Sequence, residues 1–225
     1  ITDYEKYNSI IANNKITDNI ELEYTPIPNV LLTGFTGFLG AHVLDSFIKN
    51  ETGNIYCLIR KKDNLSAEQR LMNVLHFYFG ESYDGLIGKR IHLVEGDITL
   101  ENLGLTDKEY EALGNKLTTV IHCAALVKHY GNYDTFKKIN IDGTQKIVDL
   151  CERFNLRLLH ISTISVSGNN LAEGSNIENY FGRDIMYDET NFYIGQNLKN
   201  FYVHSKFEAE RIVLEAISRG VSACI

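Results

Sequence analysis

A glycine-rich turn between a predicted strand and a predicted helix constrains the fold more than any other feature of the sequence. A run of apolar or β-branched residues at 30–33 predicts the strand, glycines follow at 34, 37 and 40, and helical periodicity begins next. The first glycine permits a tight turn, the second admits a pyrophosphate, and the third allows close helix packing. Spaced glycines also occur in ordinary turns, but this context of strand and helix predicts a dinucleotide site. The expected contacts are Thr33, Gly34, Thr36, Gly37, Phe38, Leu39 and Gly40.

The alternation of strand and helix continues along the chain. Further strand-like runs lie at 55–59, 91–94, 119–123, 158–161 and 221–225. Apolar residues between the runs recur with helical period, and one such face holds Leu39, Val43, Leu44, Phe47 and Ile48. Alternating strands and helices predict parallel βαβ units. We therefore expect an α/β fold with a Rossmann doubly wound parallel sheet, and 225 residues with 44% hydrophobic content suffice for one such domain.

Two polar segments depart from this pattern. Residues 1–28 are rich in Asn, Asp, Tyr and Ile and hold both prolines, which predicts an N-terminal linker segment with one helix and leaves 29–225 as the nucleotide-binding domain. Residues 168–200 are polar and aromatic without sustained periodicity, and loops of that length are often functional. Because the chain starts at Ile1 and stops inside an apolar run, we expect it to be part of a longer protein.

Charge and hydropathy exclude two classes of partner. The formal net charge of -7 provides no basic stripe for nucleic acid. Apolar runs all fall short of the roughly 18 residues that a membrane helix needs, and the first thirty residues do not resemble a signal peptide. We therefore expect no nucleic-acid or membrane partner and a cytoplasmic location.

Cysteine and histidine spacing gives no metal signature. The thiols at 57, 123, 151 and 224 form no CxxC pair, which favours buried free thiols over disulfides or metal ligands. His122 and His129 stand seven apart, without an HExxH pattern or a carboxylate partner. The sequence predicts no metal site.

Arginine follows the second predicted strand at the position that distinguishes dinucleotides. An acidic residue there binds the ribose 2′-hydroxyl of NAD, whereas arginine accommodates the 2′-phosphate of NADP. Arg60 stands twenty positions after Gly40 and is followed by two lysines. A solvated basic loop is the alternative, but the strand end favours phosphate contact. Arg70 is either a second phosphate contact or a charge on a helix surface. The sequence therefore predicts NADP.

A YxxxK pattern occurs twice, and its context distinguishes the copies. One runs from Tyr133 to Lys137, before the fifth predicted strand and without a hydroxyl residue upstream. The other runs from Tyr202 to Lys206, follows that strand and its Ser-Thr end, and opens a helical stretch. Chance alone explains about one match in a sequence of this composition. Context selects the second copy.

The chain resembles the extended short-chain dehydrogenases, and within them the thioester reductase domains that end some nonribosomal peptide synthetases. Carboxylic acid reductases and fatty acyl reductases are related to these domains. The resemblance spans nearly all of 29–225 and omits the C-terminal substrate region of such proteins. It rests on TGFTGFLG at 33–40, CLIR at 57–60, VEGDI at 94–98, VIHCAA at 120–125, Asn140 with Gly143 and Thr144, HISTISVSG at 160–168 and YVHSK at 202–206.

The resemblance implies a catalytic set of Thr163, Tyr202 and Lys206, with Asn140 as a fourth member of the proton relay. Hydride addition to a carbonyl develops negative charge on oxygen, which hydroxyl donors stabilise. A lysine one turn from a tyrosine stabilises the ionised phenol and eases proton transfer. Thr163 could instead be an ordinary residue at a strand end, but the YVHSK that follows favours the catalytic role.

Further cofactor contacts follow from the same resemblance. It places Asp97 and Ile98 near the adenine, Ala124 and Ala125 beside the ribose and phosphates, and Lys206 on the nicotinamide ribose. A carboxylate that caps its own loop is the alternative for Asp97. Cys123 is interpreted as a core residue, because hydride transfer needs no covalent nucleophile.

The expected function is NADPH-dependent reductive release. The substrate is an acyl or peptidyl thioester on the phosphopantetheine arm of a carrier protein, and the product is an aldehyde, with further reduction to an alcohol left open. One alternative is a nucleotide-sugar epimerase or dehydratase with tightly retained NAD, against which Arg60 argues. Another is a non-catalytic NADP-binding module, although such modules typically lose the tyrosine and lysine.

Overall fold

A six-stranded parallel sheet forms the centre of the molecule in a computed structural model, which describes residues 3–4, 6–14, 25–62, 64–128, 130–168 and 191–225. The strand order is β3-β2-β1-β4-β5-β6, and every neighbouring pair is parallel. The strands are β1 (Asn29–Thr33), β2 (Asn54–Ile59), β3 (Ile91–Glu95), β4 (Thr119–His122), β5 (Arg157–His160) and β6 (Ala223–Cys224). This order confirms the predicted Rossmann sheet. The strand order reverses between β1 and β4, and such folds open a crevice for ligands at that point.

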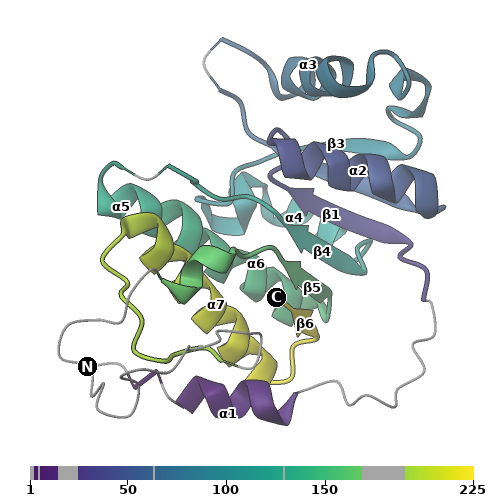
Figure 1. The fold of residues 1–225 in the computed structure, drawn as a ribbon. Coiled ribbons are helices and arrows are strands. Elements are labelled where there is room, and N and C mark those ends of the chain that lie inside the picture. Colours follow the sequence, from purple (N-terminus) through teal and green to yellow (C-terminus); the bar gives the residue numbers. More distant parts are fainter. Residues whose placement is uncertain (1–2, 5, 15–24, 63, 129, 169–190) are drawn as a thin grey trace.

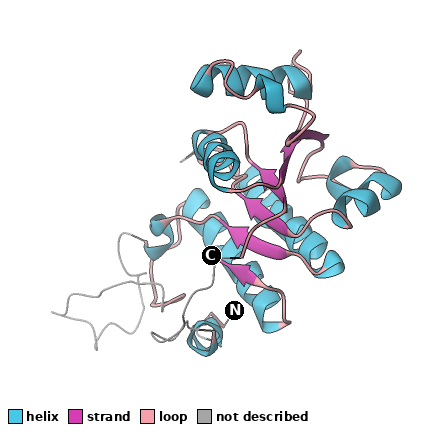
Figure 2. Ribbon diagram, turned by 90° about the vertical axis from the view of Figure 1, so that its right-hand side faces the viewer, coloured by secondary structure: helices cyan, strands magenta, loops and turns pink. Residues whose placement is uncertain are grey.

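Helices cover both sides of the sheet (Figures 1 and 2). The described α-helices are α1 (Lys6–Asn13), α2 (Phe38–Asn50), α3 (Ala67–Phe79), α4 (Asp107–Gly114), α5 (Tyr133–Phe136), α6 (Gly143–Phe154) and α7 (Phe201–Ser218). A π-helix at Lys137–Asp142 joins α5 to α6, and short 3₁₀ segments lie at Asp84–Leu86, Glu101–Gly104 and Ile164–Ser167. Within the described residues, no helix is both long and apolar enough to cross a membrane.

Alternating residues of β1 build the two cores. Val30 and Leu32 pack into the cluster that α2 and α3 share with the sheet, while Leu31 points to the opposite cluster with α4, α6 and α7. Because successive side chains of a strand point to opposite faces, a central strand covered on both sides is apolar throughout. This burial explains why residues 30–32 are all apolar, and it fixes β1 beneath the glycine turn.

Helix α1, the helix expected within residues 1–28, packs against α7 (Figure 1). Tyr7 is only 1% exposed, and its hydroxyl donates to the carboxylate of Glu215 on α7. Nearby, the rings of Phe192 and Phe207 stack with their centroids 4.1 Å apart. The N-terminal helix therefore shares a hydrophobic cluster with the helix that carries the YVHSK pattern.

Three details differ from the sequence-based expectations. Leu39 is 47% exposed and does not share the buried face of α2, because it lies in the first turn, beyond the sheet. Strand β6 covers only Ala223–Cys224 of the predicted 221–225. All four cysteines are free, and Cys57 and Cys151 are buried as expected, but Cys224 is exposed on the edge strand.

Candidate active site

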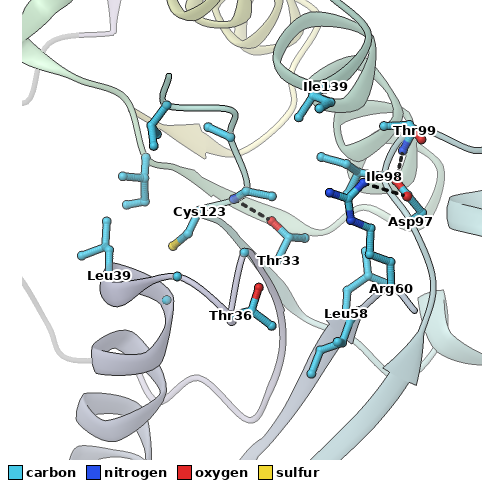
Figure 3. A pocket seen from close by; sticks show the side chains of 18 of the residues that line it. Thr33, Thr36, Leu39, Leu58, Arg60, Asp97, Ile98, Thr99, Cys123 and Ile139 are labelled. Carbon is cyan, nitrogen blue, oxygen red and sulfur yellow. Dashed lines mark hydrogen bonds and ion pairs between the residues drawn. The ribbon is translucent and has the colours of Figure 1, made fainter. Parts of the chain in front are cut away.

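A cavity of about 550 Å³ lies over the carboxyl ends of the strands, at the point where the chain order reverses (Figure 3). Most of the predicted site residues line it, and they come from separate stretches of the sequence. They are Thr33, Gly34, Thr36, Gly37, Phe38, Leu39, Gly40, Arg60, Arg70, Asp97, Ile98, Ala124, Ala125, Tyr202 and Lys206. Asn140 and Thr163 do not line the cavity.

The glycine turn is shaped by two close approaches of backbone. Gly34 has a φ of +75°, and a Cβ there would lie 2.5 Å from the nitrogen of Ala124. A Cβ on Gly40 would lie 2.3 Å from the carbonyl oxygen of Gly34. Gly37 is different, because its Cβ would meet nothing nearer than 3.4 Å. Packing of the chain therefore requires glycine at 34 and 40, whereas Gly37 leaves space that a phosphate group fits.

The N-terminus of α2 points toward this space. Gly37 is the N-cap, and no side chain caps the helix there. The first N–H groups of a helix carry partial positive charge and bind anions well. A cradle of glycine backbone at an uncapped helix start fits a dinucleotide pyrophosphate.

Two arginines and an aspartate lie together in the cavity wall. Arg60 Nη1 lies 3.4 Å from Asp97 Oδ2 (Figure 3), and Arg70 donates to the backbone oxygen of Arg60 and, over 3.2 Å, to Thr36 Oγ1. Asp97 Oδ1 also accepts from the N–H of Thr99 over 2.8 Å. Burial raises the pKa of Asp97, but the Thr99 hydrogen bonds and the Arg60 charge outweigh it, so the pKa is lowered. Asp97 therefore caps its loop and also lines the cavity.

Helix α7 carries Tyr202 and Lys206 to the same cavity. Asn200 Oδ1 starts the helix by accepting from the N–H groups of Tyr202 and Val203, at 2.9 and 3.2 Å. Tyr202 and Lys206 stand one helical turn apart, and both line the cavity. The other YxxxK copy, with its tyrosine on α5, does not line it. This placement supports the choice made from sequence context.

The ammonium group of Lys206 is deeply buried. The residue is 3% exposed, and Nζ donates to the backbone oxygen of Ile161 over 2.7 Å and to Nε2 of His160 over 3.3 Å. Burial lowers the pKa of Lys206 to about 8, while the charge of Glu210 acts in the opposite direction. Because Nε2 of His160 accepts, the proton of the neutral ring sits on Nδ1, which has no hydrogen-bond partner in the described structure.

Hydroxyl groups follow β5 at two successive positions. Ser162 lines the cavity, and its hydroxyl donates to the carboxylate of Glu210. Thr163 is half-buried, and its Oγ1 accepts from the N–H of Ser165 over 3.2 Å, which starts a 3₁₀ turn. The hydroxyl of Thr163 therefore shapes the loop, whereas Ser162 reaches the cavity wall.

Asn140 acts on backbone rather than on the cavity. It is buried in the π-helix, its Oδ1 accepts from Leu126 N over 2.7 Å, and its Nδ2 donates to Leu126 O over 3.1 Å and Ser205 Oγ over 2.8 Å. A π-helix turn often marks a functional site. Here it aims Asn140 so that one amide fixes both the loop after β4 and helix α7.

A directed hydrogen-bond chain runs beneath the cavity. Ala124 N–H donates to Thr33 Oγ1 over 3.2 Å, and Thr33 lies 2.7 Å from His122 Nδ1. On the other side of the ring, His122 Nε2 lies 3.2 Å from Thr144 Oγ1, which donates to Asn140 O over 2.6 Å. Because the proton of Thr144 is committed, His122 must donate from Nε2 and accept at Nδ1. Burial and the nearby Lys206 charge lower the pKa of His122 to about 3, so the ring is neutral.

Several of these polar groups were missed by sequence reasoning, namely His122, His160, Ser162 and Glu210. The two histidines are the last residues of β4 and β5, and a polar residue that ends a buried strand was the available signal. Glu210 was hidden because a glutamate on a helix is ordinarily solvated.

Cys123 is half-buried and packs against the hydrophobic core as expected, but it also lines the cavity. Burial raises its pKa to about 11, so the thiol is neutral. A neutral thiol is a weak nucleophile, in keeping with chemistry that needs no covalent step. Across the described residues, no group of three or more His, Cys, Asp or Glu could hold a metal ion. The absence of a metal stays a prediction.

The reversed sheet order, the glycine cradle and the Tyr-Lys pair on one cavity define an oxidoreductase of the extended short-chain dehydrogenase class. Its cradle and charged ends fit a nicotinamide dinucleotide. The family described as Male sterility protein matches residues 32–225, and the chain belongs to this family.

Its relatives include parts of large synthases. A linear gramicidin synthase of Brevibacillus parabrevis is 33% identical over 196 residues, which cover 87% of this chain and 4% of that protein. Probable polyketide synthase 3 of Dictyostelium discoideum is 29% identical over 231 residues, which cover 97% of this chain and 8% of that protein. The chain thus spans a small part of these curated relatives.

The solved structures that resemble this chain include reductase domains of biosynthetic enzymes. A thiolation-reductase di-domain from an archaeal non-ribosomal peptide synthetase is 40% identical, with a TM-score of 0.83 over 99% of this chain and 45% of that chain. The reductase domain of the aureusimine biosynthetic cluster is 30% identical, with a TM-score of 0.76 over 99% of this chain and 55% of that chain. UDP-glucuronic acid 4-epimerase of Bacillus cereus, 20% identical with a TM-score of 0.58 over 87% of this chain and 54% of that chain, shares the fold alone.

Proposed function

We propose that this chain binds NADPH and reduces an acyl or peptidyl thioester held on the phosphopantetheine arm of a carrier protein. The observation that carries the proposal is a single cavity lined by the glycine cradle, two arginines and the Tyr202 and Lys206 pair. The similarity to reductase domains of peptide synthetases supports the thioester as substrate. It also supports a carrier protein as partner, since the archaeal relative is itself a thiolation-reductase di-domain.

The preference for NADP rests on the arginine pair. Arg70 holds the backbone oxygen of Arg60, and both side chains line the cavity. Arg60 is 50% exposed at its side chain, so it is accessible to an anion, and its ion pair with Asp97 orients it toward the cavity. Guanidinium groups bind phosphate in a bidentate manner. The 2′-phosphate is the part of NADP that such a pair recognises.

In the proposed reaction, NADPH supplies the hydride to the thioester carbonyl carbon. The Tyr202 hydroxyl donates a proton to the carbonyl oxygen, which gives a thiohemiacetal. When the C–S bond breaks, the hydroxyl proton of the thiohemiacetal passes to the departing sulfur, and the aldehyde and the free phosphopantetheine thiol are released. The buried charge of Lys206 favours the ionised form of Tyr202 and so eases that proton transfer. Thr163 is proposed as a second donor to the oxygen. To reach it, its hydroxyl must turn from the Ser165 N–H when substrate binds.

Asn140 has an indirect part in this proposal. Its amide joins Leu126 to Ser205, one residue before Lys206, so it positions the catalytic helix against the loop of the cavity wall. We assign it as a positioning residue of the relay. A second reduction of the aldehyde to an alcohol would use the same groups in the same order.

The proposal also includes the domain division and the location. Residues 29–225 form the nucleotide-binding domain, and residues 1–28 lead into it, with α1 anchored on α7. The buried free thiols of Cys57 and Cys151 fit a reducing compartment, which supports the cytoplasm.

The test mixes the intact protein with an acyl-phosphopantetheine thioester and follows NADPH absorbance. We expect thioester-dependent oxidation of NADPH, slow oxidation of NADH, and aldehyde among the products. Tyr202→Phe should abolish turnover and leave NADPH binding nearly intact. No oxidation above background would refute the reductase assignment. Protein that retains NAD through purification would instead support the epimerase alternative.

A further inference from the structure

The cationic head of Lys206 is buried in a setting that opposes its charge. It is 3% exposed, and its nearest described partners on the strands are neutral, namely the oxygen of Ile161 and the ring of His160. Cys123 and His122 lie on the β4 side, and both are uncharged near neutral pH. A buried ammonium group without a counter-charge tends to lose its proton.

One buried carboxylate, that of Glu210, offsets the effect of burial on Lys206. Glu210 stands one turn after Lys206 on α7, is itself only 9% exposed, and is the carboxylate whose charge acts on Lys206. Burial raises the pKa of Glu210, while the Ser162 hydroxyl and the charge of Lys206 lower it. Ser162 donates to this carboxylate from the cavity wall. Ser162 and Lys206 therefore favour the ionised form of Glu210, and the Glu210 charge in turn favours the protonated form of Lys206.

We propose that Glu210, held by Ser162, is a positioning residue that keeps Lys206 charged inside the cofactor cavity. The proposal rests on the proposed function in so far as Lys206 takes part in reduction. Glu210 does not line the cavity. In this proposal it nevertheless sets the pH range in which Lys206 is charged and reduction proceeds. Glu210→Gln preserves the shape and an oxygen that can accept from Ser162, so it removes mainly the charge.

The first measurement does not depend on activity. Acetic anhydride acetylates only neutral amines, so the acetylation rate of Lys206 in the intact protein, followed against pH by peptide mass spectrometry, reports its charge. We expect a midpoint near pH 8 in the parent protein. In Glu210→Gln the midpoint should fall by about one pH unit or more, as expected for loss of a nearby opposite charge. An unchanged midpoint would overturn the proposal.

Two further variants sharpen the test. Glu215→Gln is the matched control, because it removes a carboxylate from the same helix that bonds to Tyr7 and Arg211 instead, and it should leave the Lys206 midpoint in place. Ser162→Ala should lower the midpoint by a smaller amount. Should Glu210→Gln fail to fold, Ser162→Ala decides the matter, since no shift there counts against the proposal.

The second measurement separates this inference from the proposed function. NADPH oxidation should decrease as rising pH removes the proton of Lys206. In Glu210→Gln this decrease should begin at a lower pH than in the parent, and its shift should match the shift of the acetylation midpoint. A shifted midpoint in a protein without thioester reduction would support the Glu210 assignment and refute the proposed function. If the acetylation midpoint shifted while the pH dependence of NADPH oxidation stayed the same, the charge of Lys206 would not govern reduction.

Discussion

The hydroxyl of Thr33, at the end of β1, donates to Nδ1 of His122, at the end of β4, over 2.7 Å. The bond joins the two strands between which the chain order of the sheet reverses. On one side it continues to the N–H of Ala124 beside the glycine turn, and on the other to the π-helix. The polar chain therefore adds side-chain bonds to the backbone pairing of the two strand ends beneath the cavity.

Thr33→Val should destabilise the protein by about 2 kcal/mol, because it leaves the buried His122 Nδ1 and the half-buried Ala124 N–H without a partner. Urea unfolding followed by circular dichroism measures the loss. Thr118→Val is the control, since the exposed Thr118 hydroxyl donates to the oxygen of Asn29 at the other end of β1 and should contribute less than about 1 kcal/mol. Equal losses in the two variants would contradict the importance of the chain.

Stability should fall as the pH drops below about 6.5. The pKa of His122 is lowered to about 3 in the folded protein, from 6.5, so the unfolded chain binds more protons between these values. The contribution of the neutral His122 to the free energy of unfolding is complete above pH 6.5. It decreases by about 1.4 kcal/mol per pH unit as the pH falls toward 3. The pKa of His160 is lowered too and adds in the same direction, whereas the raised pKa of Glu210 opposes it.

Urea titrations between about pH 7 and pH 5 measure this slope, in a range where carboxylates of ordinary pKa stay ionised. His122→Gln should flatten this slope relative to the parent. A slope in His122→Gln as steep as that of the parent would show that His122 is not the group responsible.

Gly40→Ala and Gly37→Ala should separate folding from binding. The Cβ of alanine at 40 would lie 2.3 Å from Gly34 O, so we expect a loss of about 2 kcal/mol in stability and loss of NADPH binding. At 37 the nearest atom is 3.4 Å away, so stability should change by less than about 1 kcal/mol. NADPH affinity, measured by fluorescence titration, should nevertheless fall. Unchanged affinity in Gly37→Ala would mean that no phosphate occupies this space.

Arg70→Ala should weaken NADPH more than NADH. Loss of one charged contact to the 2′-phosphate predicts about a tenfold rise in the Kd of NADPH, while the Kd of NADH should change little. Arg153→Ala, on α6 and away from the cavity, serves as the control for a lost surface charge. If the binding of NADPH and of NADH weakened equally, Arg70 would act by holding Arg60 and Thr36 in place and not by contacting the 2′-phosphate.

Sequence reasoning succeeded where a local pattern carries the physics. The strand residues 30–32 are apolar because the strand is covered on both sides. Gly34 has the positive φ of a tight turn, and Gly40 lies against the carbonyl oxygen of Gly34, six residues away. It failed for Leu39, whose helical period was right but whose turn extends past the sheet. Periodicity reports which residues share a face, and it does not report where the sheet ends.

The sequence by itself determined the parallel α/β fold, the glycine turn and which YxxxK copy lines the cavity, because each depends on residue type and chain order. Tertiary structure alone decided which hydroxyl reaches the cavity, that Asn140 bonds to backbone, and that Glu210 and Lys206 are both buried on α7. These outcomes depend on the ends of separate strands and helices meeting in space. Burial then changes the charge of groups that, on a helix or strand alone, would simply be solvated.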